Sequence, residues 1–386
     1  MKALIVTCAH FYRDAEGIYY TPSVHDNVFF QRYLKVFDQV RVIGRCFPAT
    51  ISSTEKMLKV SGPGIEVYPL PWYQGMKELL RKSIGIIKTL RHAADGCECI
   101  VYRIPQVESY LAGFFMKTRK KPFAVEVVAD PVDWTMLHWF GKNINIYLLR
   151  FMVRHADCVS YVRMGLNQRY PAGKRAFVTE YSSIELPDSA LHTPKQYQSM
   201  DNIRLIHVAN AIANETKGHK VLMDAVKICR DEGCPASVTF IGDGEKIPEF
   251  TEYAKAIGIE DAIRFAGRIS DRDEMLCLLN QADLMVFPSE TEGLPRVIIE
   301  AAAAGLPCLA SRVGGIPDLL EEQYMFEPKD AKGYADKIIF LKNHPNELSE
   351  MSKQNIEVAK RYVSSRLTPR RSAFYQKLRN CIKNTK

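Results

Sequence analysis

Short apolar runs alternate with longer amphipathic segments along almost the whole chain. Repetition of a strand followed by a helix is typical of βαβ units, in which helices connect parallel strands and cover the sheet. We therefore predict an α/β protein with two Rossmann-like, doubly wound parallel sheets. The predicted strands span 3–7, 40–43, 99–102, 123–128 and 158–161 in the first half, and 203–208, 237–241, 263–266, 284–287 and 307–310 in the second. The predicted helices span 27–37, 76–92, 220–231, 246–257, 272–281, 295–304, 332–342 and 346–362.

The chain has 386 residues, which is long for one domain and comfortable for two. A polar stretch without periodicity follows Tyr181 and reads as a linker between the two series of strands and helices. We expect one domain over 1–190, a second over 200–364, and a C-terminal helix or tail over 365–386 that packs back on the first domain. Doubly wound sheets bind ligands at the carboxyl ends of their strands, so a cleft between the two domains is the expected ligand site.

Composition narrows the classes of function and the compartment. The net charge is +8, and the excess of Lys and Arg lies entirely in residues 1–200, which suits an anionic membrane surface or a phosphate-bearing substrate. No nucleic-acid-binding motif is present, so we expect no nucleic acid partner. The first apolar stretch is too short for a signal peptide and no run is long enough to span a bilayer, which predicts a cytoplasmic protein.

Metal and dinucleotide chemistry find no support in the motifs. Cys97 and Cys99 are the one close cysteine pair, and they lack the spacing of a structural zinc site. Asp271 and Asp273 open a predicted helix, so capping explains them better than a metal-binding DxD motif. No glycine-rich dinucleotide fingerprint and no Walker phosphate loop occurs. We predict neither a metal ion nor a cofactor.

The segment 287–320 is the most informative one. A buried strand ends at a Pro-Ser pair, and Glu292 then lies in a strand-to-helix loop while Glu300 lies on the helix. Carboxylates accept hydrogen bonds, so these two suit the hydroxyls of a sugar and a ribose. The amides of Gly293, Leu294 and Arg296 lie at the helix start, where an anion is favoured. The alternative is an ordinary helix with solvated carboxylates.

This segment resembles the E-x7-E motif of retaining family-4 glycosyltransferases with the GT-B fold, of the polysaccharide-biosynthesis type. The match includes a PS pair before the motif, EG at Glu292, EA at Glu300, and the A-x-G-x-P and GGxP strings that follow. The resemblance implies transfer of a sugar from a nucleotide diphosphate sugar to a hydroxyl, with retention of configuration and without a metal. It assigns Glu292 to the sugar and Glu300 to the ribose.

Three further elements occur in the order that the family shows. Lys217-Gly218 resembles the KG element whose lysine meets the donor diphosphate, although an isolated surface lysine is the alternative. Gly242 and Gly244, in the IGDG string, resemble the glycine turn at a strand end. The AGRI string contains Arg268 and Ile269 and resembles the strand end that cradles the nucleotide base, with a plain surface charge as the alternative for the arginine.

The sequence also departs from the family pattern. The family often has a GR pair after the first strand of the second domain, and this chain has Ala209-Asn210. We therefore expect Asn210 to line the donor site, and Arg296 or Arg268 to supply the second cation for the diphosphate. The acidic residue after the GGxP turn is Asp318 instead of the commoner Glu.

The first half resembles the same family less specifically. The string ending in Ala-Asp-Pro at 129–131 is similar to an EVVGDP segment, and no histidine follows where many relatives use one against the donor sugar. Asp130 is our substitute candidate for a catalytic group, with helix capping or loop ordering as the alternative. Gly17 follows the first strand, where it would approach the transferred sugar or simply make a turn.

The acceptor prediction rests on basic, amphipathic segments. Leu79, Leu80, Ile84, Ile87 and Leu90 can share one face of the predicted helix over 76–92, with Lys and Arg around it. Such a helix can lie on an anionic leaflet, or its apolar stripe can pack on the sheet. A second basic cluster spans 119–121. We expect a glycan or a lipid-linked, phosphate-bearing acceptor, with peripheral contact at the inner membrane face.

The predicted protein is thus a retaining, metal-independent hexosyltransferase of cell-surface polysaccharide assembly. Its domain over 1–190 is expected to bind the acceptor, and its domain over 200–364 the nucleotide sugar. The predicted catalytic groups are Glu292, Lys217 and Asp130. Two alternatives remain open: a non-hydride nucleotide-sugar epimerase or hydrolase on the same fold, and a non-catalytic scaffold that binds nucleotide sugars.

Overall fold

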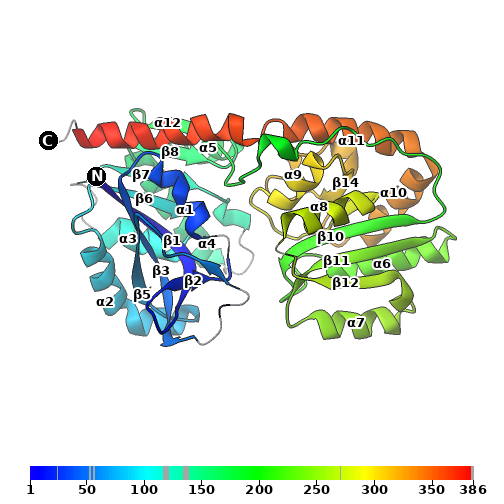
Figure 1. The fold of residues 1–386 in the computed structure, drawn as a ribbon, viewed down its shortest axis with the longest axis horizontal. Coiled ribbons are helices and arrows are strands. Elements are labelled where there is room, and N and C mark those ends of the chain that lie inside the picture. The colour runs from blue at the N-terminus through cyan, green and yellow to red at the C-terminus, as the bar shows by residue number, and fades with distance from the viewer. Residues whose placement is uncertain are drawn as a thin grey trace. The chain divides into compact units, whose positions relative to one another are not determined.

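A computed structural model of the chain describes residues 1–23, 25–51, 54, 57–115, 121–133, 139–269 and 271–383. The chain forms two compact units (Figure 1). Unit 1 comprises Met1–Ser183 together with the C-terminal segment from Thr368 onward, and unit 2 comprises Ile184–Leu367. The division after Ser183 lies at the start of the predicted linker, and the C-terminal segment belongs to the first unit.

Unit 1 is built on one sheet whose strands follow the order β4-β2-β1-β6-β7-β8-β9, with β3 and β5 extending it from β1. All pairs are parallel except the two that involve β2. The strands are β1 (Lys2–Arg13), β2 (Tyr19–Thr21), β3 (Gln39–Thr50), β4 (Leu58–Lys59), β5 (Ile65–Pro71), β6 (Cys99–Ile104), β7 (Phe123–Val127), β8 (Cys158–Tyr161) and β9 (Phe177–Glu180). The helices are α1 (Asn27–Leu34), α2 (Gly75–Ala93), α3 (Val107–Phe115), α4 (Trp139–His155), α5 (Gly165–Arg169) and most of α12 (Ser364–Lys383).

Helices cover both faces of the unit 1 sheet, as the continuous apolar runs of its strands require. Buried side chains of α2, α3 and α4 form one core cluster with the strands, among them Leu90, Tyr110 and Leu149. Phe123, Val125 and Val127 of β7 face this cluster. Because side chains alternate along a strand, Glu126 must face the opposite side, and there it meets α1 and α12.

Glu126 anchors the C-terminal helix to the first unit. Its carboxylate is fully buried and accepts hydrogen bonds from three tyrosines: Tyr33 of α1 at 3.1 Å, Tyr181 at 3.0 Å and Tyr375 of α12 at 2.6 Å. The Arg103 guanidinium forms an ion pair with the same carboxylate. A buried charge persists only where partners surround it, and here the partners join segments that lie far apart in the sequence.

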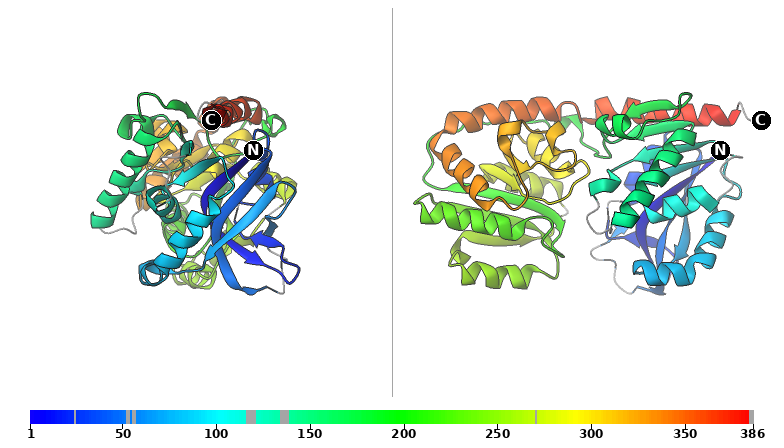
Figure 2. Two further views of the ribbon diagram at one scale, coloured as in Figure 1. Left: turned by 90° about the vertical axis from the view of Figure 1, so that its left-hand side faces the viewer. Right: turned by 180° about the vertical axis from the view of Figure 1, so that it is seen from behind.

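Unit 2 is built on an all-parallel sheet with the order β12-β11-β10-β13-β14-β15 (Figures 1 and 2). Its strands are β10 (Ile203–Ala211), β11 (Ala236–Asp243), β12 (Ile263–Gly267), β13 (Leu284–Phe287), β14 (Cys308–Ser311) and β15 (Met325–Phe326). Its helices are α6 (His219–Asp231), α7 (Ile247–Ala256), α8 (Arg272–Gln281), α9 (Arg296–Ala303), α10 (Ala331–Asn343) and α11 (Pro345–Ala359). Short 3₁₀ turns span Pro131–Asp133 in unit 1 and Asp188–Ala190, Glu260–Ala262, Ile316–Asp318 and Glu322–Tyr324 in unit 2.

Two parallel-sheet α/β units confirm the predicted fold class. All ten predicted strands and all eight predicted helices occur, with ends that differ from the predicted ones by at most seven residues. The sequence analysis missed β2, β4, β5, β9 and β15 among the strands and α3, α4 and α5 among the helices, because these elements are short or lie in segments without clear periodicity. Among the described residues, no helix is long and apolar enough to cross a membrane.

Candidate functional site

The candidate site lies in unit 2, where the loops that follow β10, β13 and β14 meet at the carboxyl ends of the strands. Backbone hydrogen bonds hold these loops together: the Glu290 amide donates to the Thr216 carbonyl at 2.8 Å, and the Gly315 amide donates to the Gly293 carbonyl at 2.7 Å. The loop after β11 joins them, since the Ile212 amide donates to the Asp243 carbonyl at 2.9 Å. A rigid sheet therefore presents several loops to one place, which is where open α/β sheets bind ligands.

Two glycines let these loops come close enough. Gly218 has φ +76°, and a Cβ there would lie 2.2 Å from the Pro288 carbonyl oxygen. Gly314 has φ +55°, and a Cβ there would lie 1.8 Å from the Glu292 carbonyl oxygen. A side chain at either position would meet both the left-handed backbone and a carbonyl of the loop after β13. The KG element and the GGxP turn thus pack closely against the loop that carries Glu292.

The structure brings two of the predicted catalytic groups into contact. Lys217 Nζ lies 2.6 Å from Glu292 Oε1, an ion pair between the loop after β10 and the loop after β13. The lysine side chain is 32% exposed and the glutamate side chain 11% exposed. The ammonium also lies over the Phe287 ring, 5.8 Å from its centroid. The pair is accessible to a ligand and is positioned before one arrives.

Glu300 lies on α9, about one turn after the helix begins at Arg296. Burial raises the pKa of this carboxyl above its ordinary value, against the lowering effect of the positive charges of Arg296 and Arg272. No hydrogen bond or ion pair involves its carboxylate within the part of the chain that the structure describes. A half-buried carboxyl without a partner is suited to accept hydrogen bonds from hydroxyls.

The other predicted donor-binding residues of unit 2 lie at or near the carboxyl ends of its strands and at the start of α9. Gly293, buried Leu294 and Arg296 follow Glu292 into α9, which begins at Arg296, one residue later than predicted. Exposed Asn210 lies at the end of β10, and Gly242 lies where a Cβ would come within 1.8 Å of the Ala209 carbonyl oxygen. Three more predicted residues directly follow strands: Arg268 and Ile269 follow β12, and Gly244 follows β11. Their contacts with a donor stay a prediction.

The two predicted residues of unit 1 have structural surroundings. Asp130 is 2% exposed, and its carboxylate accepts hydrogen bonds from the Tyr170 hydroxyl at 2.6 Å and the Val132 amide at 3.0 Å, and pairs with Arg169 at 2.8 Å. These are contacts of a residue that orders its own loop, and the catalytic role stays a prediction. Gly17 is exposed with φ +82° in a turn closed by its amide on the Asp14 carbonyl.

Two further predictions concern the N-terminal cap of α8 and the binding of metal ions. Asp271 caps α8 by accepting a hydrogen bond from the Glu274 amide at 2.8 Å, as the capping interpretation predicted. No group of three or more His, Cys, Asp or Glu side chains within the described ranges is arranged to hold a metal ion. Arg119 and Lys120 of the predicted basic cluster lie outside those ranges.

Sequence reasoning missed a pair of buried histidines beneath the site. His207 of β10 and His219, the first residue of α6, have ring centroids 4.7 Å apart and are 0% exposed. His207 Nδ1 hydrogen-bonds the Val286 carbonyl at 2.9 Å, while its Nε2 and both ring nitrogens of His219 have no partner among the described residues. The one available signal was that His219 follows the KG element directly.

We expect this pair to make unit 2 sensitive to acid. Burial, with a smaller contribution from the Lys217 charge, lowers the pKa of His219 from 6.5 to about 4. Between these values the unfolded state binds a proton that the folded state does not, so stability falls as the pH decreases from about 6.5 to about 4, by roughly 3 kcal/mol. Thermal unfolding of His219→Phe should show a weaker loss over this window than the parent protein.

Exposed His344, which lies on the surface between α10 and α11, provides the control for that measurement. His344→Phe should leave the pH dependence of unfolding unchanged. Equal pH dependence in His219→Phe and the parent protein would contradict the assignment.

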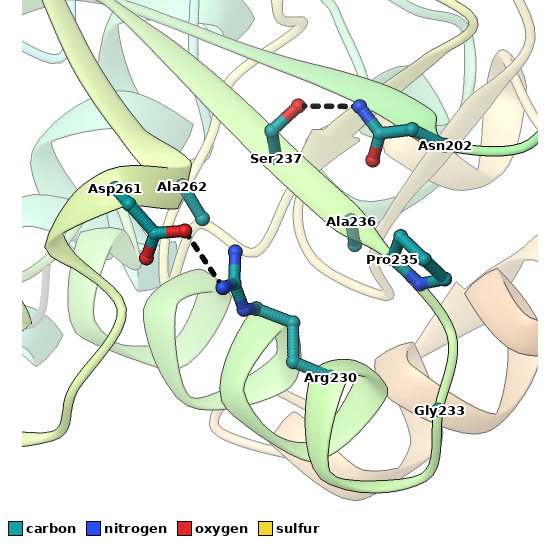
Figure 3. A pocket seen from close by; sticks show the side chains of 8 residues that line it. All are labelled: Asn202, Arg230, Gly233, Pro235, Ala236, Ser237, Asp261 and Ala262. Atoms are coloured by element: carbon teal, nitrogen blue, oxygen red, sulfur yellow. Dashed lines mark hydrogen bonds and ion pairs between the residues drawn. The ribbon is translucent and has the colours of Figure 1, made fainter.

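A separate hollow in unit 2 lies at the other edge of the sheet. It has a volume of about 430 Å³ and is lined by residues at the amino ends of β10 and β11 and by the turn before β12 (Figure 3). An ion pair between Arg230 and Asp261 at 2.7 Å and a hydrogen bond between Asn202 and Ser237 at 3.2 Å occupy its polar groups. Parallel sheets bind ligands at the opposite edge, so this hollow is not the candidate site.

Comparison with known proteins places the fold and the site in one class. Sucrose-phosphate synthase from Thermosynechococcus elongatus has a TM-score of 0.72 at 15% identity, covering 99% of this chain and 100% of that one. HepE of Anabaena, solved in complex with UDP and glucose, has a TM-score of 0.66 at 16% identity, covering 99% of both chains. The two parallel-sheet units therefore have the fold of GT-B glycosyltransferases.

Sequence similarity leads to the family. A family model described as "Glycosyl transferases group 1" matches residues 202–344, which include Lys217, Glu292 and Glu300. Protein CapJ of Staphylococcus aureus is 29% identical over 305 residues, or 78% of this chain and 76% of CapJ. N-acetyl-alpha-D-glucosaminyl L-malate synthase of Bacillus anthracis is 29% identical over 253 residues, covering 62% of this chain and 63% of that protein. The part of the chain that carries the candidate site is thus similar to group 1 glycosyltransferases.

Proposed function

We propose that this protein transfers a sugar from a nucleotide diphosphate sugar to a hydroxyl of a glycan or lipid-linked acceptor, with retention of the anomeric configuration. The contact between Lys217 and Glu292 carries the proposal, because it sets a cation and a hydroxyl-binding carboxylate side by side at the carboxyl ends of the strands. A diphosphate needs a cation, and a sugar ring needs acceptors for its hydroxyls. Glu300 supplies a second carboxylate, for the ribose.

The proposed reaction needs no metal ion from the protein. As the bond between the sugar and the diphosphate breaks, negative charge grows on the departing phosphate oxygen. The Lys217 ammonium and the amides at the start of α9 would stabilise that charge, since preorganised donors do so at little reorganisation cost. Glu292, released from Lys217 by the diphosphate, would hold sugar hydroxyls. In a front-face course, the acceptor hydroxyl attacks on the side of the leaving group and gives its proton to the departing phosphate oxygen. This course retains configuration without a protein nucleophile.

A role in cell-surface polysaccharide assembly fits the kinds of relatives that the chain has. Besides CapJ, the amylovoran biosynthesis glycosyltransferase AmsK of Erwinia amylovora is 29% identical over 172 residues, covering 43% of this chain and 37% of AmsK. HepE was solved in complex with UDP-glucose, so UDP-sugars are the first donors to test.

Ligand screening tests the donor class. Melting temperatures measured with UDP-, GDP- and ADP-sugars should rise with one of these series, because a ligand that binds only the folded state stabilises it. With the donor identified, NMR of the product should show the anomeric configuration of the donor, and a chelator should leave the rate unchanged. Release of free nucleotide without any acceptor would favour an epimerase or hydrolase, and donor binding without turnover would favour a scaffold.

Helix α2 supports the proposal that this protein is cytoplasmic and contacts an anionic membrane surface at the inner face of the membrane. The predicted apolar stripe divides in two: Leu79 and Leu90 pack into the core, whereas Leu80 and Ile84 are 66% and 83% exposed. Met76, one turn before Leu80, is 60% exposed, so three apolar side chains follow one another at helical spacing. Exposed Lys77, Arg81, Lys88 and Arg91 lie on the same helix. An apolar row flanked by cations matches the chemistry of an anionic leaflet.

Flotation with liposomes tests this contact. The protein should float with vesicles that contain phosphatidylglycerol and stay behind with purely zwitterionic vesicles. Replacing Leu80 and Ile84 by Gln should abolish flotation, because each loses apolar area that the leaflet would bury. Exposed Phe340 of α10 offers the control, since Phe340→Gln removes a comparable apolar surface from unit 2. Equal flotation of the α2 variant and the parent would exclude the contact.

A further inference from the structure

A cluster of aromatic rings lies at the carboxyl edge of the unit 1 sheet, where the function proposed above assigns no residue. Strands β1, β3 and β5 are adjacent and parallel. Tyr12 lies near the end of β1, Phe47 lies in the second half of β3, and Trp72 follows β5 directly. The ring centroids are 5.5 Å apart for Tyr12 and Phe47, 5.4 Å for Phe47 and Trp72, and 6.0 Å for Tyr12 and Trp72. We refer to these three side chains as the aromatic platform.

The aromatic platform is not part of the hydrophobic core. Phe47 is 37% exposed, and Tyr12 and Trp72 are half-buried, whereas the neighbouring Tyr73 lies inside the core cluster of the sheet. Large rings that gather at the surface leave apolar area in water, and such area often marks a binding surface. The carboxyl edge of a parallel sheet is also the edge that binds ligands.

Unpartnered polar groups accompany the rings. The His10 ring packs edge-on against Trp72, with centroids 4.9 Å apart, and its Nε2 is buried without a hydrogen-bond partner among the described residues. Gln106, at the start of α3, is 7% exposed, and its Oε1 also has no partner within the described ranges. A buried polar atom without a partner is unfavourable unless a ligand or a water molecule supplies one.

Two charged residues near this edge, Arg45 and Glu108, form an ion pair with each other. Arg45 Nε lies 3.0 Å from Glu108 Oε1, and the Tyr73 hydroxyl donates to the same oxygen at 2.7 Å. Burial, together with the positive charge of Arg45, lowers the pKa of His10 from 6.5 to about 4, so its ring is neutral at neutral pH. The edge thus offers apolar ring surface and neutral hydrogen-bonding groups, which matches a neutral, hydroxyl-bearing ring better than an anion.

We propose that the aromatic platform binds a pyranose ring of the acceptor glycan, with His10 and Gln106 hydrogen-bonding its hydroxyls. The C–H groups on one face of a sugar ring carry slight positive charge and pack against the electron-rich faces of aromatic rings. The hydroxyls at the rim of the sugar would satisfy His10 Nε2 and Gln106 Oε1. This inference rests on the proposed function only where it identifies the bound glycan as the acceptor. Saccharide binding to unit 1 can be measured without a donor.

Saturation-transfer NMR on the full chain tests the proposal, with maltotriose and triacetylchitotriose as probes. In the parent protein, saturation should reach the ring protons of at least one of the two. Trp72→Leu and Tyr12→Leu should reduce this transfer roughly fivefold or more, because each removes a stacking ring. Trp72→Phe keeps an aromatic ring and should retain most of the saturation transfer. It is the control for a loss of signal that is caused by misfolding. Phe340→Leu removes an exposed ring from unit 2 and should change nothing.

The outcomes separate this proposal from the proposed function. No saturation transfer to either saccharide, in a protein whose melting temperature rises with a nucleotide sugar, would overturn the platform and leave the proposed function intact. Equal transfer in Trp72→Leu and the parent would also overturn it. Saccharide binding that depends on Trp72, in a protein that binds no nucleotide sugar, would support the platform and refute the proposed function.

Discussion

Glu292→Gln should lower kcat/KM for sugar transfer on the order of a thousandfold, with little change in the melting temperature. The substitution keeps the shape of the side chain and removes the charge that Lys217 contacts at 2.6 Å. It also replaces a carboxylate, which accepts hydrogen bonds from sugar hydroxyls at both oxygens, by an amide that accepts at only one. Loss of one preorganised polar group at a reacting centre costs about 3–4 kcal/mol, which corresponds to this factor. Initial rates with the identified donor provide the measurement.

Glu290 offers a matched control two residues earlier in the same loop. Its carboxylate pairs with Lys329 at 3.3 Å, whereas the Glu292 carboxylate pairs with Lys217. Glu290→Gln should therefore retain activity within about twofold, as surface ion pairs contribute little. A double variant of Lys217→Met and Glu292→Gln adds a second comparison. If the two side chains act as one unit, the activity of the double variant should be scarcely lower than that of the less active single variant. Similar activity in Glu292→Gln and Glu290→Gln would remove Glu292 from the site.

Gly314→Ala should reduce transfer by about a hundredfold or more through a residue that never touches the ligand. The added Cβ would lie 1.8 Å from the Glu292 carbonyl oxygen, so the GGxP turn and the loop after β13 must separate. A displacement of about 1 Å at a catalytic group can cost a factor of about a hundred. The left-handed backbone at φ +55° adds about 1 kcal/mol to the loss of stability. Transfer rates and urea unfolding, measured together, separate the two effects.

Gly258→Ala isolates the backbone contribution. Gly258 also has positive φ, at +71°, but a Cβ there would meet nothing within 4 Å. This variant should lose about 1 kcal/mol of stability and keep its activity. Activity of Gly314→Ala within tenfold of the parent would show that the loop accommodates the methyl group. It would also show that the close packing of the GGxP turn does not position Glu292.

The sequence predicted the fold where the physical signal is local. The apolar runs of β10, β11 and β13 are mostly buried and bounded by turn residues, so the sequence pattern alone located them. Strand β5 (Ile65–Pro71) was missed because prolines interrupt it and its side chains are only partly buried. Strand β9 is half-buried throughout and short, which leaves no apolar run to recognise.

The candidate site could be predicted as a set of residues and not as a set of contacts. The motif identified Lys217, Glu292 and Glu300, but no spacing rule gives the 2.6 Å ion pair between the first two, since 75 residues separate them. The close approach of Gly314 to Glu292 likewise depends on how two loops from different strands pack. The buried His207 and His219 illustrate the same limit, because each looks like an ordinary polar residue in its own segment.

The anchoring of the C-terminal helix by Glu126 bears on the order in which the parts of the protein fold during synthesis. Unit 2 is inserted in the sequence of unit 1, so ribosomes complete its strands and helices before Tyr375 leaves the exit tunnel. Until then the first 183 residues have Glu126 and Arg103 on a sheet face that its last helix has not covered. The nascent first unit is thus the segment for which a chaperone would be needed, and the docking of α12, which is synthesised after unit 2, comes late in its folding.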